Sequence, residues 1–239
     1  MRLYVIRHGD PDYEHDALTP RGEAEAQALA AYLPRLGITH IYCSPLGRAK
    51  ATCAPCAQAL GLPVQELDWA RELTGVYYEV EGFGKAAPFT LPGEVTYGLN
   101  PWPRYRGWQE QAYFDHPQLG RLIRQMEEGS DALLKAHGYE REGARYRVIR
   151  PNADRVAVFC HHGIGTSWMA YLLRIPYQAA WAGMWQACTS FAEISMECLS
   201  ERYAVPRLLR MGATPHLDLA GLSQVERGLA TSREAPELP

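Results

Sequence analysis

The sequence has no long hydrophobic run and no strong excess of either charge. Its 239 residues include 24 Lys and Arg and 27 Asp and Glu, which gives a formal net charge of -3. A chain without a basic field has no electrostatic support for binding nucleic acid or an anionic membrane. The apolar stretch 3–6 ends at Arg7 and is too short for a signal peptide or a membrane span. We therefore expect a cytoplasmic protein with no nucleic-acid partner and no membrane partner.

Cysteine is also too sparse to form a disulfide framework. There are six cysteines in the whole chain, a number that fits a reducing compartment. Cys53 and Cys56 have the spacing of half a zinc site, but no second pair accompanies them. We expect both side chains to be packing residues in a helix.

What the sequence does contain is an alternation of short apolar segments with helical patterns. Segment 3–6 has the length and composition of a buried strand, and segments 38–43, 62–67 and 156–159 are predicted as further short strands. Strands that alternate with helices predict an α/β fold with a mostly parallel central sheet and helices on both faces. Two later segments, 188–194 and 207–211, are predicted as further strands, with an edge of the sheet as one place for them.

Two helix starts carry the same local signature, a hydroxyl residue followed by proline. Thr19-Pro20 and Ser44-Pro45 each offer a side-chain N-cap and a proline suited to the first helical turn. Pro55 lies inside the second helix and is expected to kink or shorten it. A further helix is predicted near residues 118–137.

The domain organisation predicted is a single α/β domain over residues 1–220 with one insertion. Residues from 76 to about 150 break the alternation and are rich in glycine, proline and aromatic residues. We expect this insertion to form a lid or a side wall. Residues 221–239 are predicted to be a polar C-terminal tail.

Residues suited to hold a phosphoryl group follow three of the predicted strands. They are Arg7-His8, the segment 44–49 that contains Arg48, and His161. A phosphoryl group in transfer needs planar, permanently charged donors around its oxygens, and Arg7 and Arg48 supply them. His8 can act as a nucleophile through one ring nitrogen if the other donates to a backbone carbonyl.

These motifs, in this order, resemble those of the histidine phosphatase superfamily, which includes the cofactor-dependent phosphoglycerate mutases. Arg7-His8-Gly9 resembles the signature at the end of the first strand, and segment 18–22 resembles the family's helix entry. Ser44-Pro45-x-x-Arg48-Ala49-x-x-Thr52 resembles the second phosphate-pocket motif, and segment 156–163 the strand with the second catalytic histidine. The resemblance covers roughly residues 1–75 and 155–217.

The resemblance implies a phosphoglycerate mutase-like fold and a metal-independent phosphomonoester hydrolase with no cofactor. In this interpretation His8 is phosphorylated during turnover, and Arg7, Arg48 and His161 bind the phosphate. His161 is the second catalytic histidine, because it directly follows its strand, and His162 lies at the rim. Glu72 occupies the place of the general acid, although Glu79 and Glu81 lie close enough in sequence to serve instead.

Three other functions remain open on the sequence alone. The same pocket could serve phosphoglycerate mutase-type transfer, in which a second hydroxyl takes the phosphoryl group instead of water. The fold could also carry a non-catalytic module that binds a phospholigand. A dinuclear metal hydrolase would draw its ligands from His8, Asp10, Asp12, His15, Asp16, His161 and His162. The partner expected is a small phosphomonoester, whose leaving group these motifs do not specify, and they leave the oligomeric state open.

Overall fold

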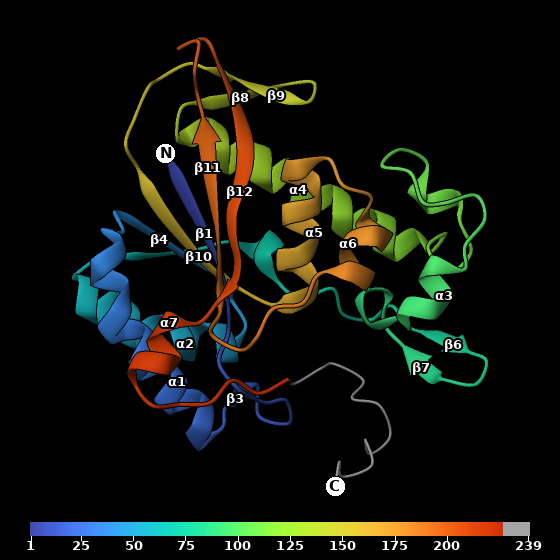
Figure 1. Ribbon diagram of the computed structural model, residues 1–239, viewed down its shortest axis with the longest axis horizontal. Coiled ribbons are helices and arrows are strands. Elements are labelled where there is room, and N and C mark those ends of the chain that lie inside the picture. The colour runs from blue at the N-terminus through green and yellow to red at the C-terminus, as the bar shows by residue number, and fades with distance from the viewer. Residues whose placement is uncertain (227–239) are drawn as a thin grey trace, which may run out of the picture.

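The computed structural model describes residues 1–226, which form a mixed eight-stranded sheet covered by helices (Figure 1). In spatial order the strands are β5 (Val64–Glu66), β4 (His40–Cys43), β10 (Arg155–Cys160), β1 (Arg2–Arg7), β11 (Phe191–Glu197), β12 (Tyr203–Ala213), β9 (Arg145–Val148) and β8 (Tyr139–Glu142). Two separate hairpins pair β2 (Pro11–Asp12) with β3 (Ala17–Leu18), and β6 (Tyr78–Val80) with β7 (Gly84–Ala86).

The helices have the following bounds. They are α1 (Pro20–Tyr32), α2 (Gly47–Leu60), α3 (Gly93–Tyr97), α4 (Pro117–Ala136), α5 (His162–Leu173), α6 (Tyr177–Gly183) and α7 (Pro215–Leu219). Short 3₁₀ turns occupy Leu33–Leu36, Asp68–Ala70, Pro88–Thr90 and Trp108–Glu110. None of the helices within residues 1–226 combines the length and the apolar character needed to cross a membrane.

The α/β fold is confirmed, but the expectation of a mostly parallel sheet is wrong. Strands β5, β4, β10 and β1 are mutually parallel, whereas β1–β11, β11–β12, β12–β9 and β9–β8 are antiparallel pairs. A short connection over residues 198–202 joins β11 to β12, and so short a link permits only antiparallel pairing. The two late strands also lie inside the sheet and not at an edge, since β11 pairs directly with β1.

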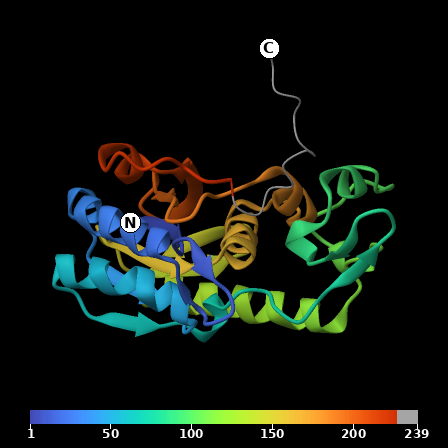
Figure 2. The ribbon, with the colours of Figure 1, turned by 90° about the horizontal axis from the view of Figure 1, so that it is seen from below.

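Side chains of the central strands point alternately into two hydrophobic cores. Leu3 and Val5 pack in the core beneath α4, α5 and α6, while Tyr4 and Ile6 pack in the core beneath α1 and α2. The two groups of helices lie on opposite faces of the sheet (Figures 1 and 2). Successive side chains of β1 point to opposite faces of the sheet, and helices cover both faces. Residues 3–6 are therefore all buried, which explains why this segment is a continuous apolar run. The predicted helices on both faces are present.

The two predicted hydroxyl caps have different outcomes. Thr19 caps α1 as expected, because its Oγ1 accepts a hydrogen bond from the Gly22 amide at 3.1 Å. Ser44 does not cap α2, which begins at Gly47. The Gly47 amide instead donates to the carboxylate of Asp16, 31 residues earlier in the chain, at 2.6 Å. Pro55 does not shorten α2, which continues to Leu60.

The segment predicted as an insertion divides into two structural parts. Its first part contains the β6–β7 hairpin and α3, which project to one side of the sheet (Figure 1). Its second part, α4 with β8 and β9, belongs to the main body, because α4 covers one face and the two strands extend the sheet edge. Only the first part, with the β6–β7 hairpin and α3, therefore lies where it could form a side wall. Of the predicted C-terminal tail, residues 221–226 are described and the remainder lies outside the described residues.

The Thr19 cap gives a stability prediction. Thr19→Ala removes the oxygen that accepts from the Gly22 amide and also the hydroxyl that donates to Asp10 Oδ2 at 2.7 Å. We expect the free energy of unfolding to fall by about 1 kcal/mol, the usual effect of losing an N-cap. Urea denaturation followed by circular dichroism measures this change. Thr19→Ser is the matched control, because it keeps the hydroxyl, and equal losses in the two variants would contradict the capping role.

Candidate functional site

The candidate site lies at the carboxyl ends of three adjacent parallel strands. Strand β1 ends at Arg7, β4 at Cys43 and β10 at Cys160, and the register pairs Arg7 with Cys160 and Cys43 with Phe159. The residues that follow, His8, Ser44 and His161, therefore leave the sheet at the same edge. This is the edge at which open α/β sheets place their ligands. The three predicted phosphate-binding segments are thus brought together.

His8 is held in one tautomer by its own neighbourhood. Its Nδ1 lies 2.7 Å from the Gly9 carbonyl oxygen, which can only accept, so Nδ1 carries the proton. Its Nε2 lies 3.3 Å from Nε of Arg48 and accepts that N–H. Burial, followed by the charge of Arg7, lowers the pKa of His8 from 6.5 to about 3. The ring is therefore neutral, with the Nε2 lone pair facing the Arg48 guanidinium.

Gly9 is needed for a close approach between backbones. A Cβ atom at Gly9 would lie 2.7 Å from the Gly22 carbonyl oxygen, in the first turn of α1. Gly9 lets the loop after β1 lie directly against α1, which fixes the position of His8.

Arg48 is oriented by an ion pair that the sequence interpretation missed. Its Nη1 lies 2.5 Å from Oδ1 of Asp16, whose other oxygen accepts the Gly47 amide. Burial alone would raise the pKa of Asp16, but the Gly47 amide and the Arg48 guanidinium together lower it. Asp16 has a positive φ of 49° and comes from the loop between β2 and β3. Nothing in the local sequence relates this loop to Arg48.

Arg7 is buried at the end of β1 and is anchored through one end of its guanidinium. Nη1 donates to the backbone carbonyl of Gln186, and Nε has no hydrogen-bond partner among residues 1–226. A guanidinium with unused donors in a buried position can bind an anion with little rearrangement. Arg7 and Arg48 both line the same pocket.

His161 lies against His8 but does not line the pocket. The two rings are 5.1 Å apart between centroids, and Nε2 of His161 lies 2.8 Å from Ser44 Oγ. Its Nδ1 is buried without a hydrogen-bond partner in the described chain. Burial, followed by the charges of His8 and Arg48, holds the pKa of His161 well below 6.5. His162, expected at the rim, is the histidine that contributes to the pocket wall.

Glu72 is fixed at the first turn of α5. Its Oε2 accepts the Gly163 amide at 3.0 Å and its Oε1 accepts the Ile164 amide at 2.8 Å. The contact needs glycine, because a Cβ at Gly163 would lie 2.5 Å from Phe89 Cδ1 and 2.7 Å from Glu72 Oε1. Glu72 lines the pocket, whereas Glu79 and Glu81 are exposed on the β6–β7 hairpin and do not.

The pocket that contains these groups has a volume of about 450 Å³. Part of its wall comes from the hairpin and the following 3₁₀ turn, in the aromatic-rich segment that was expected to form a lid or a side wall. Tyr77 lies under Lys85, whose Nζ is 4.7 Å from the ring centroid. The lining residues are Arg7, His8, Tyr13, Arg48, Glu72, Leu73, Thr74, Tyr77, Lys85, Ala87, Phe89, Thr90 and His162.

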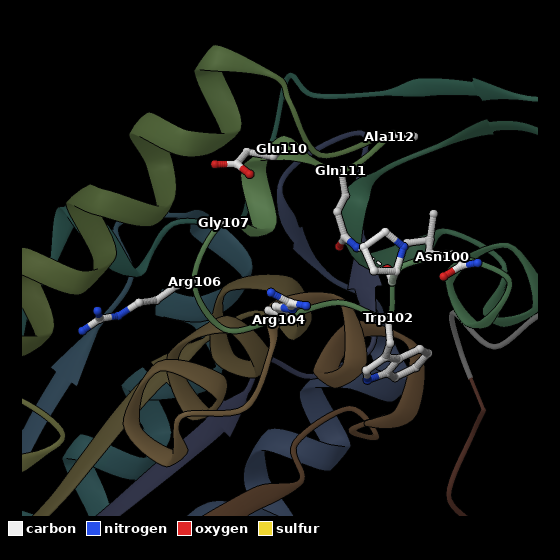
Figure 3. A pocket seen from close by; sticks show the side chains of 10 residues that line it. Asn100, Trp102, Arg104, Arg106, Gly107, Glu110, Gln111 and Ala112 are labelled. Carbon is white, nitrogen blue, oxygen red and sulfur yellow. Dashed lines mark hydrogen bonds between the residues drawn. The ribbon is translucent and has the colours of Figure 1, made fainter.

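A second pocket of about 400 Å³ lies within the inserted segment and lacks comparable chemistry. Figure 3 shows that the Arg106 side chain extends away from Arg104, so the two cations do not converge. Gln111 is turned onto the Pro101 carbonyl, to which its Nε2 donates at 2.8 Å. No titratable pair of the kind found at His8 faces this space in the described residues. The pocket at the sheet edge is therefore the candidate active site.

The ligands of the dinuclear metal alternative are not assembled. Asp16 is paired with Arg48, and Asp12 is paired with His15 at 2.8 Å on the surface. Among residues 1–226, no three of the seven residues proposed for that site bring ligand atoms within reach of one another. In the pocket, the positive charges beside His8 come from Arg7 and Arg48.

Comparison with known proteins shows which family this arrangement is similar to. Residues 3–83 match the model of the histidine phosphatase superfamily (branch 1). A Salmonella arizonae protein named "Probable phosphoglycerate mutase GpmB" is 28% identical over 158 residues, which cover 58% of this chain and 70% of that protein.

Solved structures share the fold over most of the chain. A mycobacterial glucosyl-3-phosphoglycerate phosphatase has a TM-score of 0.58 at 20% identity, covering 89% of this chain and 99% of that one. A phosphoserine phosphatase from Entamoeba histolytica, in complex with 3-phosphoglyceric acid, has a TM-score of 0.59 at 19% identity, covering 90% and 98%. The match over residues 3–83 and the shared fold make the chain similar to the histidine phosphatase superfamily, branch 1.

The buried histidines of the site give a prediction on acid stability. Burial is the main cause that lowers the pKa values of His8 and His162 from 6.5 to about 3. As the pH falls below 6.5, these two histidines bind protons in the unfolded chain but not in the folded chain, so the free energy of unfolding decreases. Between pH 7 and pH 5 the loss is on the order of 1–2 kcal/mol for each such histidine.

Urea denaturation at both pH values, in wild type and His162→Asn, measures this contribution. The variant should lose less stability than wild type when the pH falls from 7 to 5, because it lacks one of the histidines. His15→Asn is the control, because it removes a histidine that is exposed and lies outside the pocket. Equal pH dependence in wild type and His162→Asn would show that His162 is not kept neutral.

Proposed function

We propose that this protein is a metal-independent phosphomonoester hydrolase that acts through a phosphohistidine at His8. The observation that carries the proposal is the state of the His8 ring, with Nδ1 bonded to the Gly9 carbonyl and Nε2 directed at Arg48 in the pocket. A neutral imidazole nitrogen beside two guanidinium groups is suited to attack a phosphoryl group.

The reaction has two displacement steps at phosphorus. In the first, the Nε2 lone pair of His8 forms an N–P bond while the bond to the leaving oxygen breaks. The leaving alkoxide receives a proton from the general acid. In the second, a water oxygen attacks phosphorus, the N–P bond breaks, and His8 recovers its lone pair as phosphate forms. The proton of the water returns to the general base, which is the former acid.

Arg7 and Arg48 are proposed to bind the phosphoryl oxygens in both steps. Each is nearly buried, and each keeps donors toward the pocket after its anchoring contact with the Gln186 carbonyl or Asp16. Preorganised cations of this kind stabilise the charge that spreads over the equatorial oxygens in the transition state. His161 is proposed to support the same oxygens through Nδ1, the ring nitrogen that Ser44 does not engage.

Glu72 is the proposed general acid. Of the three carboxylates considered, it is the one that lines the pocket. Its attachment to the Gly163 and Ile164 amides fixes its position beside His162 and relative to the sheet edge. A fixed carboxyl group can meet the leaving oxygen in one defined orientation, as general acid catalysis requires.

The inserted segment is proposed to act as the wall that selects the leaving group. Lys85, Tyr77 and Phe89 line the pocket from this segment, together with the residues that would hold the phosphate. A lysine at that position suits a leaving group that itself carries negative charge. Phosphoglycerate mutase-type transfer, suggested by the name of the Salmonella relative, is the second candidate. Product analysis separates the two, because a mutase returns the phosphoryl group to an acceptor hydroxyl.

Trapping the intermediate tests the proposed nucleophile. Rapid acid-free quench with ³²P-labelled substrate should leave label on the protein in an adduct that survives base and is lost in acid. The His8→Ala variant should bind no label and lose turnover by at least ~10³-fold, because the covalent route is removed. His15→Ala, a change at an exposed histidine, serves as the control. Full activity of His8→Ala, or label on serine or a carboxylate, would reject the proposal.

Two leaving groups test the role of Glu72. Glu72→Gln should slow the phosphorylation step by roughly 10² to 10⁴ with an alkyl phosphate, the range found for a positioned acid. The loss with nitrophenyl phosphate should be distinctly smaller, because nitrophenolate leaves without a proton. Single-turnover rates measure both effects. Glu79→Gln and Glu81→Gln are matched controls outside the pocket, and equal losses on the two substrates would assign Glu72 another role.

A further inference from the structure

A second group of histidines lies at the amino ends of strands β4 and β10, whereas His8 lies at the carboxyl end of β1. His40 is the first residue of β4, His137 follows the last residue of α4, and Asp154 directly precedes β10. One ligand atom of each residue lies within 4.8 Å of the others. The strands β4 and β10 begin at this edge and end at the candidate active site, so the two groups are separated by the length of the strands. The proposed phosphatase mechanism uses none of the three residues.

Hydroxyl groups engage one nitrogen on each histidine. Nδ1 of His40 lies 2.8 Å from Thr39 Oγ1, which leaves Nε2 available. Nε2 of His137 lies 3.0 Å from the Tyr42 hydroxyl, and its Nδ1 lies 2.7 Å from Asp154 Oδ2. Histidines that bind metals usually have the non-ligating nitrogen held by a second group in this way. The arrangement therefore provides one oriented nitrogen from each ring and a carboxylate.

The spacing of these atoms is close to that of a metal centre. With bonds of about 2.0–2.1 Å, ligand atoms around tetrahedral zinc lie roughly 3.3 Å apart. The contact between His137 and Asp154, now 2.7 Å, would open slightly, and His40 would move inward from a separation of at most 4.8 Å. His40 is half-buried at the start of a strand, so its side chain has room for this movement.

We propose that His40, His137 and Asp154 bind one divalent transition-metal ion of the zinc class, with water as the fourth ligand. Two imidazoles and one carboxylate suit this class, whereas calcium and magnesium prefer all-oxygen sites. Binding exchanges the proton of His137 from Nδ1 to Nε2, where it is donated to the Tyr42 oxygen, and the ring stays neutral. The site ties the end of α4 to β4 and β10. The ion is thus structural, and it lies away from the phosphate pocket.

Zinc titration of the full chain, after dialysis against a chelator, tests the proposal. Calorimetry should find one Zn²⁺ per chain, and the Tm should rise with zinc concentration, because the ion binds the folded state. Cobalt should give the visible absorption of a tetrahedral centre. His40→Ala should weaken binding by at least ~100-fold, and Tyr42→Phe by about tenfold, since it removes the group that orients His137.

His15→Ala is the matched control, because His15 also pairs with an aspartate but has no third ligand nearby within residues 1–226. Its zinc affinity should equal that of wild type. His40 is the residue to change because, within residues 1–226, its side chain hydrogen-bonds to its neighbour Thr39 alone, so the variant should fold. Absence of stoichiometric zinc binding, or equal affinity in His40→Ala and His15→Ala, would overturn the proposal.

Discussion

The hydrogen bond from His8 Nδ1 to the Gly9 carbonyl is the contact on which the candidate site depends. A backbone carbonyl cannot donate, so this single bond decides which ring nitrogen has the lone pair. If the proton lay on Nε2 instead, it would face the N–H of Arg48 and the two donors would repel. The carbonyl stays in place because Gly9 packs against the first turn of α1, where no larger residue fits.

The positive charge around His8 also has structural consequences. Arg7 and Arg48 are nearly buried, and a buried cation is unfavourable unless hydrogen-bonded partners compensate for its lost hydration. Asp16 compensates Arg48 in part, while Arg7 has a single carbonyl contact. The remaining deficit is what makes the pocket receptive to an anion. The same field helps to keep both neighbouring histidine rings neutral, since it adds to the effect of burial on their pKa values.

The features that the sequence predicts are those determined by short segments. The strand before His8, the Thr19 cap and the helix near residues 118–137 depend on local periodicity and local hydrogen bonding, and they are found as expected. Asp16 was considered as a metal ligand and Ser44 as a helix cap, and their contacts with Gly47 and His161 were missed because each acts on a group far away in sequence. The mixed sheet was missed for a similar reason. Whether a late strand runs parallel or antiparallel depends on a connection whose path no local pattern specifies.

The position of β1 in the sheet affects the order in which the chain can fold. Strand β1 is the first to be synthesised, yet its neighbours are β10, which begins at Arg155, and β11, which begins at Phe191. Within residues 3–83, β1 and β4 are present without β10, the strand that separates them. The segment that carries the family signature therefore lacks the partners of its own central strand. Strand β1 cannot pair until β10 has been synthesised for one side and β11 for the other, so this apolar strand stays unpaired and prone to aggregation in the meantime.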